Sequence, residues 1–341
     1  MEVISRSKKL CVCCMEDHEV STVRLLEQST FKGKKVNYIA TYEYCDNADE
    51  YWESDDTITE NNIALKNAYR SASGLLTSDE ICAIRRKYGI SQTDLAILLG
   101  WGGKTITRYE THQIQDVAHD TILRKLDSDP EWFLALLKNC KEKLSEAAFK
   151  KYYLTAVQLF EDSQDAYLRK SIAAQYAKFE GDPNICGCTI LNIDKLIDVI
   201  AYFCNSNKVF SLFKVKLMIL LWYTDALSYK RRGYSMTGLA YTALPMGAVP
   251  IAHKSIIDLK GIEFEEIEFD EGTGIRFKSV PRSSYEHLKE DDLIILNDII
   301  KMFGNYSKNQ IVSRMHSERA YTETAPYDII QYQYALELSI D

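Results

Sequence analysis

Apolar residues recur at helical spacing along most of the chain, and strand-like alternation is confined to two regions. Near the N-terminus, VSTVRLLEQ and VNYIATYEYC alternate like paired strands. Near the C-terminus, FEEIEFDEGTGIRFKSV alternates on both sides of Glu-Gly-Thr-Gly, which is a β-hairpin signal. The pattern predicts a mainly α, multidomain fold: a small β-rich N-terminal module, a five-helix domain with a helix-turn-helix, and an α-rich C-terminal domain with a β-hairpin.

Changes in composition mark where these parts begin and end. The acidic stretch ESDDTITENN indicates a solvated linker after the first module, and GDPNICGC is the clearest break in the second half. A chain of 341 residues favours two or three domains. We expect a β-rich module at 1–63, a helix-turn-helix domain at 70–140, connecting helices at 141–182 and a C-terminal domain at 185–341.

The segment from Leu76 to His112 predicts two helices, a tight turn and a third helix. Ser91 can cap the second of these helices, and Gly100 can adopt the positive φ that the turn needs. In the third helix Ile106 and Tyr109 are expected to face inward. The polar residues around them then suit a helix laid in the DNA major groove. We expect the outward-facing residues Lys104, Thr105, Thr107 and Arg108 to reach bases or phosphates. Gln92 and Thr93, at the start of the second helix, are expected to touch phosphate.

The string IRRKYGISQTDLAILLGWGGKTITRYE resembles the helix-turn-helix of the XRE superfamily, and more closely the C-terminal domain of MqsA antitoxins. It runs on into TILRKLDSDPEWFLALL, which resembles the last helices of that family. The resemblance implies binding to double-stranded operator DNA. A helix-turn-helix reads a two-fold operator best as a dimer, so we expect a homodimer.

Three cysteines cluster near the N-terminus in LCVCCMEDHEV, where Cys11 and Cys14 have the Cys-x2-Cys spacing of a metal knuckle. The second half of such a site gives Cys45 but Ala48, so the fourth ligand is missing there. Three interpretations remain open. Zinc is bound by Cys11, Cys14 and Cys45 with a substitute fourth ligand; or the fold has lost its metal; or the cysteines are plain thiols. The substitutes considered for the fourth ligand are Cys13, His18 and Asp49.

The same module, with its FKGKKVNY strand and trailing EYW, resembles the zinc-binding N-terminal domain of MqsA-type antitoxins. The resemblance implies a zinc-ribbon-like fold with a structural metal, and this sequence departs from the family pattern at Ala48. Zinc is the only cofactor that we expect.

Two amphipathic segments, LSEAAFKKYYLTAVQLF and SQDAYLRKSIAAQYAKF, follow the helix-turn-helix and predict two helices. Their apolar faces serve either ordinary packing between domains or a dimer interface. Farther on, the residues from about Leu212 to Lys230 are apolar nearly all round and predict a central helix that Gly233 ends.

The C-terminal half resembles the Panacea domain, the SocA- and GepA-like antitoxin module. The resemblance lies in KLMILLWYTDALSYKRRGYSMTGLAYTALPMGAVP, in LKEDDLIILNDIIKMFG and in VSRMHSERAY. The family's usual Tyr-Gly-Pro-Val is replaced here by Pro-Met-Gly-Ala-Val-Pro, a partial departure. The resemblance implies binding of a protein toxin, with the contact positions Tyr223, Pro245, Gly247, Pro250 and His316. On their residue types alone, Tyr223 and His316 are more typical of structural residues that make internal hydrogen bonds than of catalytic ones.

Net charge and composition reduce the number of functional classes to which the protein can belong. The net charge of −8 places the acidity away from any DNA-binding face, or makes it a surface for a basic partner. The polar N-terminus has no signal-peptide core and no apolar run reaches membrane-spanning length, so we expect a cytoplasmic protein with no membrane contact. We find no nucleophile paired with a base and no phosphate-binding loop, and therefore expect no enzyme activity.

These features favour an antitoxin of a type II toxin–antitoxin system, whose C-terminal domain silences a toxin and whose helix-turn-helix represses its own operon. Two alternatives remain: a phage or host transcriptional regulator with a sensing domain, and an adaptor that delivers a bound protein to a protease.

Overall fold

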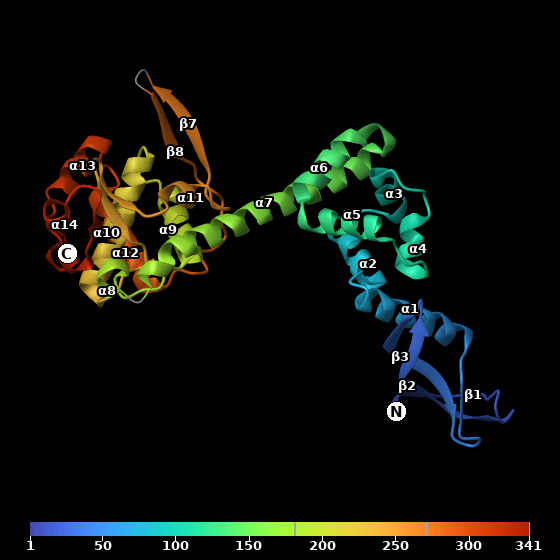
Figure 1. Cartoon of the computed structure of the whole chain (residues 1–341). Coiled ribbons are helices and arrows are strands. Elements are labelled where there is room, and N and C mark those ends of the chain that lie inside the picture. Colours follow the sequence, from blue (N-terminus) through green and yellow to red (C-terminus); the bar gives the residue numbers. More distant parts are fainter. Residues whose placement is uncertain (181, 270–271, 341) are drawn as a thin grey trace. The chain divides into compact units, whose positions relative to one another are not determined.

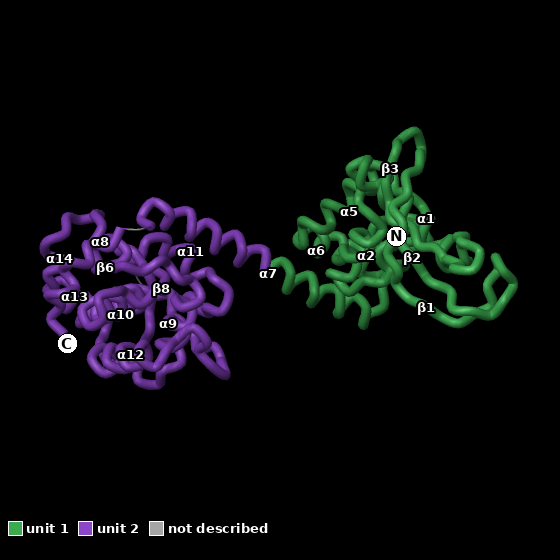
Figure 2. Tube along the Cα trace, turned by 90° about the horizontal axis from the view of Figure 1, so that it is seen from below, with its two compact units in different colours: residues 1–160 green, residues 161–341 purple. Residues whose placement is uncertain are grey.

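The computed structural model describes residues 1–180, 182–269 and 272–340. It is mainly helical, with small antiparallel sheets (Figure 1). Two compact units divide the chain, Met1–Phe160 and Glu161–Asp341 (Figure 2). The division falls inside a helix and not at GDPNICGC, of which Gly181 lies outside the described residues.

A four-stranded antiparallel sheet opens unit 1, in the order β1 (Glu2–Leu10), β2 (Asp17–Phe31), β3 (Lys34–Cys45) and β4 (Glu50–Trp52). Lys32 and Gly33 join β2 to β3 with positive φ angles of 46° and 79°, as a tight two-residue hairpin requires. The predicted small β module is therefore present.

Helix α1 (Asp55–Ala72) packs against β3. Asn61 on α1 accepts from the Thr41 amide at 2.7 Å and donates to the Thr41 carbonyl at 2.9 Å, which satisfies the open edge of β3. The prediction of a solvated linker at ESDDTITENN was wrong, and the predicted module end at residue 63 lies inside α1. The Ser54 hydroxyl caps the helix and the acidic first turn favours its N-terminal dipole, so the same polar residues start a helix.

Five further helices form the next part of unit 1, and all lie where a five-helix domain was predicted. The Ser91 cap and the left-handed Gly100, with φ of 69°, both have the expected roles. Tyr88 stacks on Phe133 with ring centroids 3.8 Å apart in the core. The helices are α2 (Ser78–Lys87), α3 (Gln92–Leu99), α4 (Thr105–Thr111), α5 (Val117–Ser128) and α6 (Pro130–Asn139).

A single 31-residue helix, α7 (Glu146–Tyr176), replaces the two connecting helices that were predicted. No glycine or proline interrupts it, and an Asp165–Arg169 ion pair one turn apart supports its middle at 2.6 Å. Tyr152 belongs to the core of unit 1, whereas Ile172 and Tyr176 belong to the core of unit 2. The sequence left open whether the apolar faces of these two segments serve packing or dimerisation. Some of their residues pack inside the core of one unit or the other.

Helix α10 (Lys214–Arg232) lies at the centre of unit 2, as predicted, with every residue from Lys216 to Ser228 buried. Gly233 ends it with φ of 78°. The helices packed around or near it are α8 (Pro183–Cys186), α9 (Ile193–Asn205), α11 (His253–Ile257), α12 (Glu290–Phe303), α13 (Lys308–His316) and α14 (Arg319–Thr322). Unit 2 also contains short 3-10 helices at Ala177–Phe179 and Tyr332–Glu337, and unit 1 contains one at Lys141–Lys143.

Two antiparallel hairpins complete unit 2. The predicted one is β7 (Phe264–Phe269) with β8 (Gly272–Phe277), and residues 270–271 of its turn lie outside the described residues. The second pairs β5 (Tyr241–Leu244) with β6 (Gly247–Pro250), and β9 (Ile329–Ile330) extends it to three strands in the order β6-β5-β9. No helix in the described part of the chain combines the length and apolar character needed to cross a membrane.

Candidate metal centre, helix surface and hairpin surface

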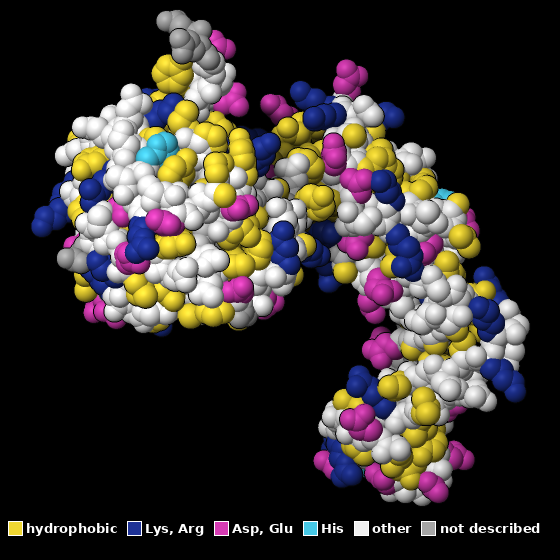
Figure 3. Space-filling view, turned by 60° about the vertical axis from the view of Figure 1, so that its left-hand side comes forward, with side chains coloured by type: hydrophobic (Ala, Val, Ile, Leu, Met, Phe, Trp, Pro, Cys, Tyr) yellow, Lys and Arg dark blue, Asp and Glu magenta, His cyan; other side chains and the backbone are white. Residues whose placement is uncertain are grey.

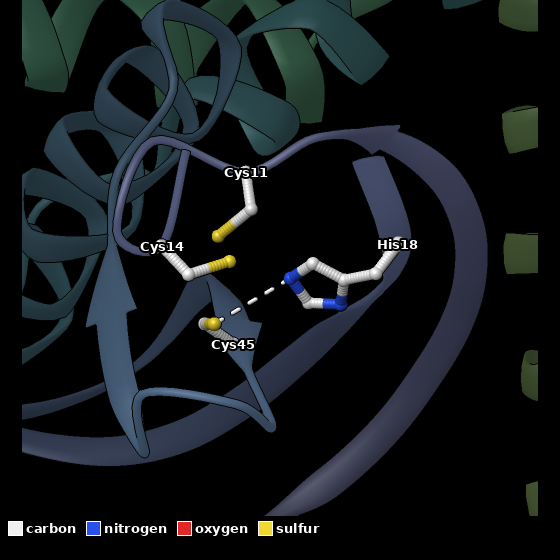
Figure 4. Close-up of side chains that lie close together, drawn as sticks. All are labelled: Cys11, Cys14, His18 and Cys45. Carbon is white, nitrogen blue, oxygen red and sulfur yellow. Dashed lines mark hydrogen bonds between the residues drawn. The ribbon is translucent and has the colours of Figure 1, made fainter. Parts of the chain in front are cut away.

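Three cysteines and one histidine converge at one end of the N-terminal sheet (Figure 4). Cys11 and Cys14 come from the turn between β1 and β2, His18 from β2 and Cys45 from the end of β3. Their ligand atoms all lie within 4.8 Å of one another, and His18 Nε2 is 3.5 Å from Cys45 Sγ. His18 supplies the fourth donor that Ala48 cannot. Asp49 instead accepts a hydrogen bond from the Tyr44 hydroxyl at 2.6 Å, and Cys13 lies outside the cluster.

The electrostatics of this cluster favour a thiolate at Cys11, whereas desolvation is the main cause that raises the Cys45 pKa to about 11. Desolvation opposes ionisation of Cys11, but hydrogen bonds from the Cys14 amide and the His18 ring outweigh it and lower the Cys11 pKa to about 6. The hydrogen bond with Cys11 is the largest cause that raises the His18 pKa. Three sulfur donors and one imidazole are a structural zinc set, and four protein donors leave no open position for catalysis. The cluster can therefore hold a metal ion.

Helix α4 and its N-cap residue Lys104 carry four of the six residues expected to reach DNA, and α3 carries the other two. Lys104 and Arg108 are exposed and one helical turn apart, and Thr93 is exposed at the start of α3. Thr105 is buried, so the expectation that it faces outward was wrong. Its place in the first turn of α4, next to Ile106, turns it toward the core, where it accepts from Arg108 at 3.5 Å.

Gln92 and Thr107 bond to each other, which the sequence pattern did not indicate. The Thr107 hydroxyl donates to Gln92 Oε1 at 2.8 Å, and Gln92 Nε2 donates to Glu110 at 2.6 Å. Arg85 completes the network with a bidentate pair to Glu110, at 2.6 and 3.0 Å. This network fixes α3 against α4 and so holds in place the helix that carries the exposed Arg108.

Arg70 at the end of α1 is a buried contact that sequence reasoning missed. Its guanidinium donates to the carbonyl oxygens of Tyr109 and Gln113 at 2.8 and 2.7 Å, and to the side chains of Asn67 and Gln115 at 2.7 and 3.1 Å. Arg70 thus ties the helix that covers the sheet to the C-terminal end of α4. A basic residue in the last turn of a helix is commonly found there because it interacts favourably with the helix dipole. The sequence around Arg70 therefore gave no sign that its side chain would be buried and would join two parts of the fold.

The five positions that the Panacea resemblance marks for toxin contact differ in exposure. Tyr223 is wholly buried and donates to Glu318 at 3.2 Å, and Gly247 and Pro250 are buried as well. His316 is half-buried and stacks on Tyr321 with centroids 4.3 Å apart. Pro245, in the turn between β5 and β6, is exposed. Direct contact with a partner is therefore open to Pro245 and excluded for Tyr223 in this conformation.

Helices α10 and α13 support the β5–β6 hairpin from behind, at Gly247. Gly247 has φ of 122°, and a Cβ there would lie 3.0 Å from Met315 and 3.1 Å from Ile219. Only glycine permits this close approach. The Tyr321 hydroxyl donates to the Leu244 carbonyl at 2.9 Å and anchors the other strand.

A buried acid links α10 to the same sheet. Asp225 accepts from the Thr237 amide at 2.7 Å, from the Thr237 hydroxyl at 2.6 Å and from the Tyr241 hydroxyl at 2.7 Å. Desolvation raises the Asp225 pKa to about 6, against these hydrogen bonds. All of its hydrogen-bond partners are buried protein groups, which fits a structural role.

Comparison with protein families gives one match. Residues 217–321 match the family described as antitoxin SocA-like, Panacea domain. The matched region begins in α10, includes the β5–β6 hairpin and ends in α14. It supports an antitoxin role for unit 2, and such a family implies a toxin as partner. No curated protein and no solved structure matched the chain.

Proposed function

We propose that the protein is the antitoxin of a type II toxin–antitoxin system. Unit 2 binds and silences a protein toxin encoded beside it, and helices α3 and α4 bind the promoter of the shared operon and repress it. The observation that carries the proposal is the match of residues 217–321 to an antitoxin domain. No catalytic step is needed for this role, because inhibition by binding is sufficient.

The operator-binding half of the proposal is supported by the geometry of α4. Lys104 and Arg108 project from one exposed side, with the helix held by the Gln92–Glu110 network. On the face drawn in Figure 3, basic and acidic side chains are interspersed. Because the chain has a formal net charge of −8, non-specific attraction to DNA should be modest, and specific contacts from two subunits on a two-fold operator should supply most of the affinity.

Zinc in the N-terminal module would have a structural role. Cys11, Cys14, His18 and Cys45 would hold the ion, and the ion would link the β1–β2 turn to the end of β3. Such a link compensates for the small core of the sheet, where the buried cluster at this end is Cys11, Val20 and Cys45.

Co-expression tests the proposal directly. The open reading frame next to this gene should stop growth when induced alone and should be harmless when this protein is induced with it. The purified pair should form a stable complex. A neighbouring product that is harmless alone, or toxic regardless of this protein, would refute the antitoxin role and leave a transcriptional regulator as the next candidate.

A further inference from the structure

A cavity of about 300 Å³ opens between the start of α10, the β5–β6 turn and the start of α11. Its wall is apolar and comes from two elements. Met218 and Ile219 on α10 form one side, and Leu244, Pro245, Met246 and Val249 on the hairpin form the other. A volume of this size is at the lower end for drug-sized ligands and suits one or two protein side chains.

The hairpin that forms this wall is held firmly in place. Gly247 presses its backbone against Ile219 and Met315, and Tyr321 anchors Leu244. Met246 at the tip is nevertheless 46% exposed. A large apolar side chain on a rigid turn, beside a preformed cavity, is the kind of anchor found at the centre of protein interfaces.

The edge of the cavity is positively charged. Lys214 and His253 line it, and Lys254 follows on α11. Desolvation and the nearby Lys254 lower the Lys214 pKa, and desolvation and Lys214 lower the His253 pKa. Asp258 is the acidic group that partly offsets the charge on Lys214. The repulsion between Lys214 and Lys254 would be relieved by a carboxylate from outside.

We propose that this cavity is the docking point for the toxin. An apolar side chain of the toxin fills the space between α10 and the β5–β6 hairpin. An aspartate or glutamate next to it in the toxin pairs with Lys214 and Lys254. This inference rests on the proposed function and adds the location and chemistry of the contact. Pro245 and Met246 touch the toxin, whereas Gly247 and Tyr321 act as positioning residues for the hairpin.

Charge and shape are tested separately, with matched controls. The double variant Lys214→Glu and Lys254→Glu reverses the charge at the edge of the cavity. Its control, Lys301→Glu and Lys308→Glu, makes the same change in net charge at exposed sites on α12 and α13. Met246→Glu blocks the cavity, and Ile294→Glu is its control on α12, at a side chain that is 57% exposed. Each full-length variant is co-expressed with the toxin from the neighbouring gene, and binding is measured on the purified proteins.

We expect both cavity variants to bind the toxin at least about tenfold more weakly and to lose protection, since each removes more than about 1.4 kcal/mol of contact energy. Both controls should bind as wild type does. A photo-crosslinker at position 246 should label the toxin, and one at position 294 should not. Wild-type-like binding by both cavity variants would overturn the docking site while leaving the antitoxin role intact. Crosslinking at 246 to a second copy of this chain would also overturn it. Failure of the wild type to bind the toxin would instead refute the proposed function itself.

Discussion

His18 completes a candidate metal site whose expected fourth ligand is absent at Ala48. It lies on β2, far in sequence from Ala48, yet its ring meets Cys45 at 3.5 Å because antiparallel pairing brings the start of β2 near the end of β3. The spacing of Cys11, Cys14 and Cys45 indicated the site. It could not choose between Cys13, His18 and Asp49, because the choice depends on strand register.

We predict that the purified protein contains about one equivalent of zinc, as a closed set of three cysteines and one histidine requires. His18→Ala and Cys45→Ala should each lose most of the metal and melt at a lower temperature, since metal binding contributes to folding. Cys13→Ala should keep it. Elemental analysis checks the content, and less than about a tenth of an equivalent in the wild type would contradict a zinc site.

Asp225 gives a pH-dependent prediction. Its pKa in the folded state is about 6, against about 3.9 for an unperturbed aspartate. Because the folded pKa is raised, its contribution to stability is full below about pH 4 and is lost as the pH rises through 6. The free energy of unfolding of the wild type should therefore fall relative to Asp225→Asn between pH 4 and 7, by on the order of 3 kcal/mol.

Denaturant unfolding followed by the fluorescence of Trp222 measures this difference, in a background where the other tryptophans are replaced by phenylalanine. The same comparison cancels the titration of groups common to both proteins. A difference that stays flat with pH would show that Asp225 does not titrate in this range.

At the scale of elements, prediction succeeded where local signals are strong. The Ser91 cap, the Gly100 turn and the fully apolar α10 each follow from neighbouring residues alone. Prediction failed where tertiary context decides. The acidic stretch after β4 has a local helix start at Ser54, but only its packing on β3 distinguishes it from a solvated linker. Helix α7 is continuous because each of its ends packs into the core of one unit. Thr105 was predicted to face outward but is buried, because a shift of one residue along a short helix moves a side chain from the exposed face to the buried face.

The DNA-binding role of α4 is tested by Arg108. Arg108→Ala should cost about 1–3 kcal/mol of operator binding if the guanidinium reads a base. Arg86→Ala, at an exposed position on α2, serves as the control and should bind DNA nearly as the wild type does. Thr105→Val should weaken DNA binding less than Arg108→Ala does, because it removes only the buried hydroxyl that accepts from Arg108 and keeps the guanidinium. Fluorescence anisotropy with promoter DNA at fixed salt makes the measurement. Equal affinity of wild type and Arg108→Ala would refute the proposed orientation of α4.

At the scale of the whole molecule, the two units have separate cores that share one helix. The family match and the cavity fall in unit 2, and the metal cluster and α4 fall in unit 1. We therefore expect the two activities to separate. The small N-terminal sheet and the helical C-terminal region were predicted from the sequence, but the division inside α7 was not, because an uninterrupted helix gives no compositional break.

Deletion of 185–341 should abolish toxin neutralisation and retain specific DNA binding. Arg108→Ala in the full chain should do the reverse. Growth after toxin induction and anisotropy on promoter DNA provide the two measurements. Loss of both activities in Arg108→Ala, with the fold intact by circular dichroism, would mean that the units are not functionally independent.

Arg70 has a consequence for how such a protein can be rearranged over generations. Its guanidinium joins α1 to the carbonyl oxygens at the end of α4 and to Gln115. A gene crossover between codons 70 and 115 would combine a sheet module and a DNA-binding domain that had not been inherited together, and would leave a buried cation or its acceptors without partners. New combinations of domains should instead arise from crossovers outside codons 70 to 115. The N-terminal sheet module and helices α2 to α6 are thus expected to descend as one block, while the domains that follow them are exchanged.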